Sequence, residues 1–289
     1  MAAAPPERSP LEVVQLPALS SNYIYLLRSG GSTAVVDPGD AGVVAAELQR
    51  RGWRLDAALI THHHADHTFG LGALKEEFPD LEVVGPRADA ARIPLVATAL
   101  GEGDEWSLGG VRFRTLEVPG HTRGHVAFWC PEARALFPGD TLFGLGCGML
   151  FEGDAQTMWR SLCKLAALPP ETLVYCAHEY TASNAAFAVG VNPSNEALAA
   201  RKARVDAARA EGEPTVPSLL SEELETNPFL RAGADPELRA AAGVGGGAPD
   251  WAVLGGLRAR KEGVRGRLVR TVLYPLVERL PAGVARMLA

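Results

Sequence analysis

All seven histidines of this 289-residue chain fall into three short segments. Histidines placed for packing or surface polarity would be scattered along the chain, so this clustering indicates one site built from several imidazoles. Imidazole nitrogens and carboxylate oxygens together are suitable ligands for Zn²⁺, Fe²⁺ or Mn²⁺. The segments carry His62, His63, His64 and His67, then His121 and His125, and finally His178.

The densest segment predicts two metal positions close together. In an extended loop, side chains two residues apart project to the same side, so His62 and His64 can close on one metal ion. Asp66 and His67 then point at a second centre. Each centre needs further ligands, and the candidates are His121, Asp140 and His178. For His63 and His125 we expect contacts that support the ligands, or a purely structural role.

Each histidine segment comes just after a predicted strand. The apolar run Ala57–Ile60 leads directly into Thr61 and the first segment. Strands and hairpins are also predicted at Leu11–Leu16, Tyr23–Leu27, Thr33–Val36, Leu81–Val84, Trp106–Glu117 (turning at Gly109 and Gly110), Val126–Cys130 and Ala135–Phe137. Helices are predicted at Ala41–Arg51, between Asp40 as cap and Gly52 as stop, and at Leu71–Phe78.

The character of the sequence changes after about residue 182. Asn195–Glu211 is rich in Ala, Arg and Lys and almost free of β-branched residues, which favours helix. We therefore predict two domains, a catalytic domain of residues 1–183 and a smaller helical domain of residues 184–289. Apolar pairs in the tail after Val264 have helical spacing, with a kink expected at Pro275.

Composition excludes several classes of protein. The net charge of −6 argues against a nucleic-acid-binding surface spread over the whole protein, though not against a local basic patch. No apolar stretch approaches the roughly 18 residues of a membrane span. The first ten residues resemble neither a signal peptide nor a transit peptide. Four scattered cysteines do not form a disulfide scaffold. We expect a monomer in the cytoplasm, with mitochondria as the alternative location.

The residues Thr61–His67, followed by Gly120–His121, Gly139–Asp140 and His178, resemble the metallo-β-lactamase superfamily pattern THxHxDH…H…D…H. The resemblance implies an α/β fold, an αββα sandwich with the metals at one edge between its sheets. It also implies a distribution of the ligands: His62, His64 and His121 hold one ion, Asp66, His67 and His178 hold the other, and Asp140 bridges the two.

Outside the ligands, the chain is similar to glyoxalase II, the hydroxyacylglutathione hydrolase family, over nearly its whole length. The similar segments are Ser21–Leu26, Val36–Asp40, Gly146–Gly148, His178–Thr181, Glu213–Ser218 and Asn227–Arg231. The resemblance implies hydrolysis of S-D-lactoylglutathione to D-lactate, the second step of methylglyoxal detoxification. A hydroxide between two divalent metals, zinc first and iron or manganese as alternatives, would attack the thioester, with Asp66 and Asp140 as catalytic residues.

The same resemblance assigns Tyr180, Arg258 and Lys261 to the binding of glutathione, although Arg258 and Lys261 alone could equally form a solvated basic helix face. This chain departs from the family where Met149 replaces a Lys and Phe151 replaces a Tyr. Each lost charge-assisted contact could cost on the order of 1.5 to 3 kcal/mol, enough to raise KM roughly tenfold. The departure indicates weaker glutathione binding or another thiol carrier.

Other functions are considered for the same residues. A persulfide dioxygenase with one iron needs only the first set of ligands, so the complete second set argues against it. A β-lactamase is opposed by Asp140, which stands where some of those enzymes place a Cys ligand, and by the helical domain, which has no use there. RNA-processing nucleases of the superfamily carry an added RNA-binding arm, and the sequence shows neither such an arm nor strong net basicity. Met149 and Phe151 also allow a non-catalytic or altered-specificity paralogue that binds thiol conjugates, but the complete ligand set opposes a loss of chemistry.

Overall fold

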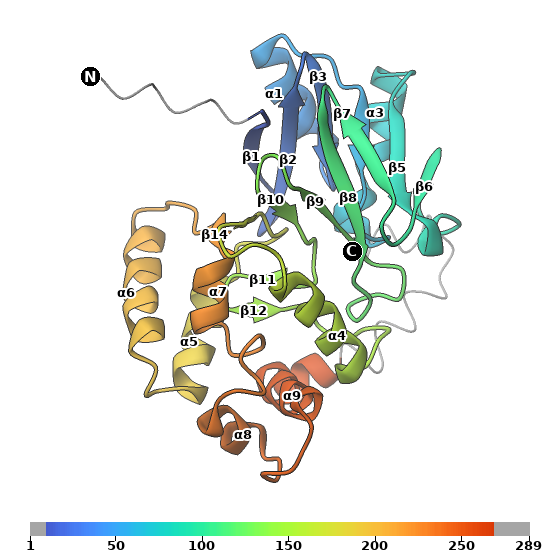
Figure 1. The fold of residues 1–289 in the computed structure, drawn as a ribbon. Coiled ribbons are helices and arrows are strands. Elements are labelled where there is room, and N and C mark those ends of the chain that lie inside the picture. The colour runs from blue at the N-terminus through green and yellow to red at the C-terminus, as the bar shows by residue number, and fades with distance from the viewer. Residues whose placement is uncertain (1–9, 269–289) are drawn as a thin grey trace, which may run out of the picture.

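The computed structural model describes residues 10–268, with side chains described up to residue 263 (Figure 1). In that part of the chain, two six-stranded sheets pack face to face and helices cover their outer faces. The expected αββα sandwich with a helical C-terminal part is confirmed. The predicted tail beyond Leu268, including Pro275, lies outside the described residues. No helix of residues 10–268 is long and apolar enough to cross a membrane.

The first sheet combines an antiparallel and a parallel part. Its order is β1 (Glu12–Ala18), β2 (Asn22–Ser29), β3 (Ser32–Val36), β4 (Ala57–Leu59), β5 (Glu82–Pro86) and β6 (Thr98–Leu100). The first three strands are antiparallel, and β3 to β6 are parallel. Helix α1 (Ala41–Arg51) connects β3 to β4, and α3 (Leu71–Glu77) lies between β4 and β5. Asp40 caps α1 and left-handed Gly52 ends it, as predicted.

The second sheet faces the first. Its order is β14 (Ser218–Leu219), β13 (Leu173–Val174), β10 (Ala135–Phe137), β9 (Val126–Cys130), β8 (Val111–Glu117) and β7 (Glu105–Leu108). The hairpin of β7 and β8 turns at Gly109 and Gly110, as predicted. Strand β14 lies beyond residue 184, so the C-terminal part of the chain supplies an edge strand of the sandwich.

Alternation of apolar side chains along the strands explains the layering. In β2, Tyr25 and Leu27 belong to the buried cluster between the sheets, whereas Ile24 and Leu26 belong to the cluster under α1 and α3. Successive side chains of a strand point to opposite faces, so a strand buried on both faces is apolar throughout. The central strands of the first sheet are thereby packed on one face against the second sheet and on the other against α1 and α3, and their ends form one edge of the sandwich.

The helical part packs on the outer face of the second sheet. It consists of α4 (Ala155–Ala166), α5 (Thr181–Val191), α6 (Glu196–Ala210), α7 (Leu220–Thr226), α8 (Pro236–Ala242) and α9 (Asp250–Leu268). One buried cluster unites Leu162 of α4 and Leu254 of α9 with Leu136 of the sheet. The predicted domain boundary at Asn184 falls inside α5 and stays a prediction. The short elements are α2 (Ala65–Thr68), η1 (Arg87–Asp89), β11 (Leu142–Phe143) and β12 (Gly146–Cys147).

Candidate metal centre

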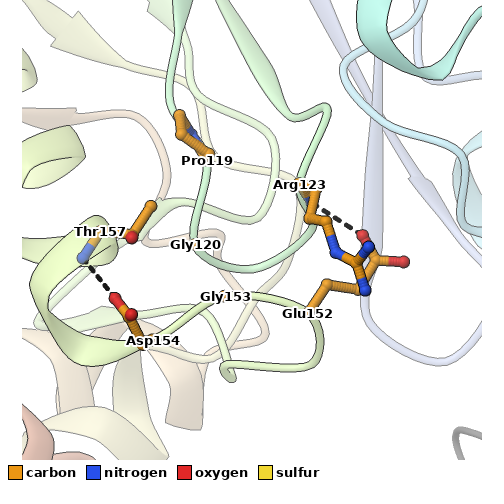
Figure 2. A pocket seen from close by; sticks show the side chains of 7 residues that line it. All are labelled: Pro119, Gly120, Arg123, Glu152, Gly153, Asp154 and Thr157. Atoms are coloured by element: carbon orange, nitrogen blue, oxygen red, sulfur yellow. Dashed lines mark hydrogen bonds between the residues drawn. The ribbon is translucent and has the colours of Figure 1, made fainter.

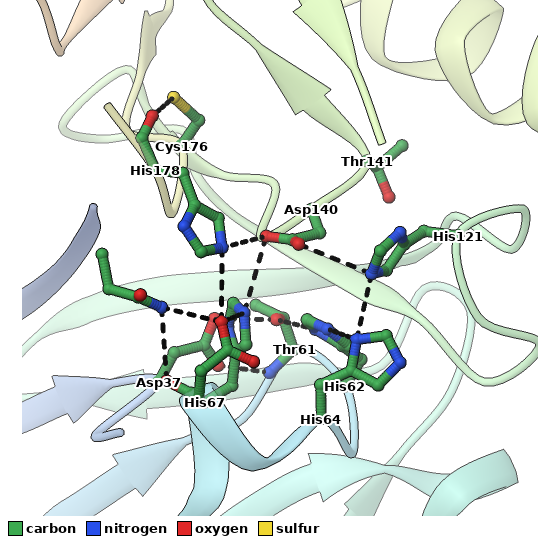
Figure 3. A network of polar contacts seen from close by, with 12 residues as sticks. Asp37, Thr61, His62, His64, His67, His121, Asp140, Thr141, Cys176 and His178 are labelled. Carbon is green, nitrogen blue, oxygen red and sulfur yellow. Dashed lines mark hydrogen bonds and ion pairs between the residues drawn. The ribbon is translucent and has the colours of Figure 1, made fainter. Parts of the chain in front are cut away.

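The predicted ligands meet at one edge of the sandwich, on segments that follow strand ends (Figure 3). Strand β4 leads into the first histidine segment, β8 into His121, β10 into Asp140 and β13 into His178. Three groups of side chains there could each hold a metal ion, with ligand atoms no more than 4.8 Å apart. The groups are His62, His64 and His121; His62, His67 and Asp140; and Asp66, His67 and His178.

In the first group, three imidazole nitrogens converge on one point. His64 Nδ1 lies 3.0 Å from His62 Nε2 and 3.1 Å from His121 Nε2. His121 Nδ1 donates a hydrogen bond to the carbonyl oxygen of Met149, at 2.8 Å, so its Nε2 carries a lone pair. His62 Nδ1 lies 3.0 Å from Thr61 Oγ1, which itself donates to Asp37. Neutral His62 and His121 therefore both direct lone pairs at the same space.

The group of Asp66, His67 and His178 combines two imidazoles and a carboxylate. Asp66 Oδ2 lies 3.3 Å from His67 Nε2 and 3.5 Å from His178 Nε2. Asp140 lies between this group and the first one. Its Oδ1 is 3.3 Å from His178 Nε2 and 3.5 Å from His67 Nε2, while its Oδ2 is 3.4 Å from His121 Nε2. One carboxylate thus faces both groups, the position in which a bridging ligand is needed.

Two observations indicate that these residues fit divalent cations. His67 Nε2 and Asp140 Oδ1 are buried and lack a hydrogen-bond partner in the described part of the chain, which is costly unless an ion satisfies them. Burial, followed by the neighbouring His67 and His125, lowers the pKa of His62 well below its ordinary value. Burial alone would raise the pKa of Asp140, but His178 and His67 lower it. Neutral imidazoles and ionised carboxylates are the forms that bind metals.

Asp37 accepts hydrogen bonds from Thr61 and from His67 of the first histidine segment, a role that the sequence did not predict. Its Oδ1 accepts from the backbone N–H of Thr61 at 2.8 Å, and its Oδ2 accepts from Thr61 Oγ1 and from His67 Nδ1, at 2.8 and 3.0 Å. The turn after Asp37 requires a glycine, because a Cβ on Gly39 would stand 1.8 Å from the carbonyl oxygen of Asp66. In the sequence, Val36–Asp40 was one of the segments similar to the family, and it carried no sign that Asp37 contacts the ligands.

His63 and His125 lie outside all three groups. His125 stacks on His62, with ring centroids 4.5 Å apart, and its Nε2 accepts from the backbone N–H of Asp140 at 3.1 Å. His63 Nδ1 lies 2.9 Å from Asp89 Oδ2. His125 therefore holds the backbone of Asp140, while His63 ties the first histidine segment to η1.

Comparison with known proteins identifies the family. Residues 18–178 match the family model described as the metallo-beta-lactamase superfamily, and residues 179–264 match that described as the hydroxyacylglutathione hydrolase C-terminus. A hydroxyacylglutathione hydrolase of Methylococcus capsulatus is 55% identical over 258 residues, which are 89% of this chain and 100% of that protein. The chain belongs to the hydroxyacylglutathione hydrolase family. A second member, from Ruegeria pomeroyi, is 52% identical over 88% of this chain and 99% of its own length.

Solved structures agree with this membership at the level of the fold. ETHE1 from Myxococcus xanthus aligns with a TM-score of 0.59 at 23% identity, over 88% of this chain and 99% of that one. TTHA1623, solved in a di-iron-bound form, aligns with a TM-score of 0.55 at 30% identity, over 76% and 100%. The superfamily model and the model of the hydroxyacylglutathione hydrolase C-terminus meet between residues 178 and 179, just before α5.

Three of the predicted substrate residues adjoin the metal groups. The ring of Phe151 makes T-shaped contacts with the rings of His64 and His121, at centroid distances of 5.6 and 5.3 Å. Tyr180 stacks on His178 at 4.7 Å, with the rings parallel, and is 38% exposed. Met149 contacts His121 through its carbonyl oxygen. An aromatic ring thus lies beside each of two ligand groups of the hydroxyacylglutathione hydrolase site: Phe151 beside that of His62, His64 and His121, and Tyr180 beside that of Asp66, His67 and His178.

The two predicted cations lie on α9. Arg258 is only 6% exposed; it donates to the carbonyl oxygen of Cys147 at 2.8 Å and pairs with Glu262 at 3.2 Å. Lys261 places its Nζ 5.0 Å from the ring centre of Phe187. Burial, followed by Arg258, lowers the pKa of Lys261 to about 8. Arg258 therefore fastens α9 to the loop that carries Met149, with Lys261 one helical turn further on.

A cavity of about 320 Å³ lies on the segment before and after His121 (Figure 2). It is lined by Pro119, Gly120, Arg123, Glu152, Gly153, Asp154 and Thr157. Gly153 N–H donates to the carbonyl oxygen of Gly120 at 3.2 Å, and Arg123 N–H donates to Glu152 at 2.7 Å. None of the predicted ligands or substrate residues lines this cavity, so we do not assign the substrate to it.

Proposed function

We propose that this chain hydrolyses the thioester bond of S-D-lactoylglutathione, or of a related 2-hydroxyacyl thiol conjugate, to D-lactate and the free thiol. That reaction is the second step of methylglyoxal detoxification. The proposal is carried by one combination in a single chain: a cluster of metal-binding side chains at the sandwich edge and a C-terminal part that matches the hydroxyacylglutathione hydrolase model. The 55% identity to a hydroxyacylglutathione hydrolase over its full length supports the same substrate class.

The proposed cofactors are two divalent metal ions, zinc first, with iron or manganese as alternatives. Bound there, the pair supplies a water nucleophile activated at neutral pH and stabilises the charge that develops on the carbonyl oxygen. The di-iron form of TTHA1623 supports a site for two metals and keeps iron open. The ligands would be His62, His64 and His121 for one ion, Asp66, His67 and His178 for the other, and Asp140 for both.

Asp66 and Asp140 have different roles in the proposed reaction. Asp140 directs one oxygen to each group, so it would fix the spacing of the two ions. The side chain of Asp66 is 34% exposed, against 1% for His67 and 5% for His178. Asp66 is therefore the ligand nearest to the approaching substrate in its group, and it would orient the attacking water. The leaving thiol has a pKa near 8.5, so its departure requires little general-acid help.

The substrate would lie across the exposed side of the ligands. Phe151 and Tyr180 would enclose the thioester between apolar ring surfaces, and Met149 would contribute apolar contact where relatives place a charge. Lys261, with Arg258 behind it, would attract the carboxylate of the glutathione moiety. The apolar character of Met149 and Phe151 makes this contact weaker than in a site with an ammonium and a phenol.

The complete group of Asp66, His67 and His178 favours a two-metal hydrolase over a dioxygenase with one iron. The complete set of seven buried or half-buried ligands also opposes a non-catalytic paralogue, because a chain that catalyses no reaction would be expected to have lost some of them. We further propose that the enzyme works as a monomer in the cytoplasm. The free thiols of Cys130, Cys147 and Cys176 are buried and fit a reducing compartment.

Steady-state hydrolysis of S-D-lactoylglutathione by the metal-analysed protein tests the proposal. We expect robust turnover in the native chain and none in His62→Ala, which removes a ligand of the first group. S-D-lactoyl conjugates of other thiols in parallel would identify the carrier. Absence of turnover with every conjugate, despite two bound metal ions, would overturn the proposal.

A further inference from the structure

Two polar side chains at the beginning of β2, one just before the strand and one at its first residue, contact the ligand group of Asp66, His67 and His178. Asn22 is 6% exposed and donates from Nδ2 to Asp66 Oδ2 at 2.9 Å and to the carbonyl oxygen of Asp66 at 3.4 Å. Ser21 Oγ lies 3.2 Å from His178 Nδ1. Neither contact is part of the ligand pattern, and the ligands concerned come from distant parts of the chain.

The backbone fixes Ser21 and Asn22 in place. Tyr23 N–H donates to the carbonyl oxygen of Ala177 at 2.7 Å, and Glu179 N–H donates to that of Ser21 at 2.8 Å. Asn22 and His178 form an antiparallel bridge between these two bonds. Since β2 is buried and paired on both sides, Asn22 at its start and Ser21 just before it are anchored to the first sheet next to both ligands.

Each of the two contacts would pre-organise a ligand. Asp66 sits on the four-residue helix α2 and its side chain is 34% exposed, so without Asn22 its carboxylate would sample several rotamers. With the proton on Nδ1, His178 donates to Ser21 Oγ, which leaves the lone pair of Nε2 facing Asp66 and Asp140. Contacts of this kind orient metal ligands and tune their affinity.

We propose that Ser21 and Asn22 are positioning residues that set the affinity of the protein for one of its two metal ions, the one that Asp66, His67 and His178 would hold. The inference rests on the two-metal site of the proposed function. In the described residues, the contacts of Ser21 and Asn22 with ligand side chains go to Asp66 and His178. In the first group, by contrast, His62 contacts Thr61 and His121 contacts the carbonyl oxygen of Met149. Substitutions at Ser21 and Asn22 should therefore weaken the binding of one ion and leave the affinity for the other ion unchanged.

The test is a zinc titration of the metal-depleted full-length protein against a chromophoric chelator, which yields two stepwise dissociation constants. In Asn22→Ala we expect one constant to weaken by about 10- to 100-fold and the other to stay unchanged. Ser21→Ala should weaken the same constant and provides an independent variant if Asn22→Ala does not fold. Tyr23→Phe is the matched control, since it removes the 2.8 Å bond to Glu179 but no contact with a ligand side chain.

The outcomes separate the inference from the proposed function. Two wild-type-like constants in both Asn22→Ala and Ser21→Ala would overturn the inference and leave the two-metal enzyme intact. Equal weakening of both constants, accompanied by a lower unfolding temperature of the metal-free protein, would also overturn it, because the residues would then support only the fold. A wild-type protein that binds fewer than two ions would overturn the two-metal site itself, before any variant is compared.

Discussion

Lys261 should make substrate binding dependent on pH above neutrality. Burial, and then the neighbouring charge of Arg258, lowers the pKa of this lysine to about 8. A lysine loses its positive charge as the pH rises through its pKa, so the attraction between Lys261 and a glutathione carboxylate weakens in the same direction. We therefore expect KM for S-D-lactoylglutathione to increase from pH 7 to pH 9.

The size of the effect follows from the fraction of charged lysine. With a pKa of about 8, roughly nine-tenths of Lys261 is protonated at pH 7 and roughly one-tenth at pH 9. If only the protonated form holds the carboxylate, KM rises about tenfold over this interval, which corresponds to about 1.4 kcal/mol of binding. An ordinary exposed lysine, with a pKa near 10.4, would stay charged over the same range.

The assay is steady-state hydrolysis at closely spaced pH values, corrected for spontaneous hydrolysis of the thioester. Lys261→Arg keeps its charge and should show a KM that stays low from pH 7 to pH 9. Lys261→Met should show a KM that is already high at pH 7 and changes little up to pH 9. A substrate with its glycine carboxylate esterified should lose the effect in the native enzyme. A KM of the native enzyme that, like that of Lys261→Met, changes little between pH 7 and pH 9 would refute the binding of the substrate carboxylate by charged Lys261.

Three further predictions concern stability, affinity and metals. Arg201→Met leaves the fully buried carboxylate of Glu223 without its cation, so the free energy of unfolding should fall by about 3–5 kcal/mol in urea denaturation; a loss below about 1 kcal/mol would contradict a structural role for the pair. The double substitution Met149→Lys with Phe151→Tyr should lower KM roughly tenfold or more with kcat little changed, and an unchanged KM would argue for a carrier other than glutathione. Removal of metal by a chelator should abolish turnover and lower the unfolding temperature, and both should return when zinc is added back.

Much of the catalytic half could be predicted from the sequence because its signals are local. The capped helix Ala41–Arg51 and the hairpin at Gly109 and Gly110 depend on neighbouring residues, and both were predicted correctly. The ligand segments were recognisable because all seven histidines fall into three short stretches, each placed shortly after a strand. Helix α4 was not predicted, although Asp154 as cap and the buried Met158 and Leu165 carry its signal.

Supporting roles were expected for His63 and His125, but those of Asp37, Ser21 and Asn22 could not be predicted, because they depend on long-range contacts. Asp37 accepts bonds from residues 24 and 30 positions away, and Ser21 meets His178 from 157 positions away. The family-like segment Ser21–Leu26 contains Asn22, but its role became visible only where the fold placed it against Asp66. Likewise, the pairing of Arg258 with Cys147 depends on how α9 packs.

The measurement that tests the central claim most directly is turnover of S-D-lactoylglutathione as a function of bound metal. Metal-depleted protein would be loaded with zinc in steps, and kcat would be recorded at each measured stoichiometry. We predict that kcat stays low up to one equivalent and reaches its plateau at two, because the thioester needs both groups of ligands occupied. A plateau at one equivalent, or no turnover at two, would contradict the claim.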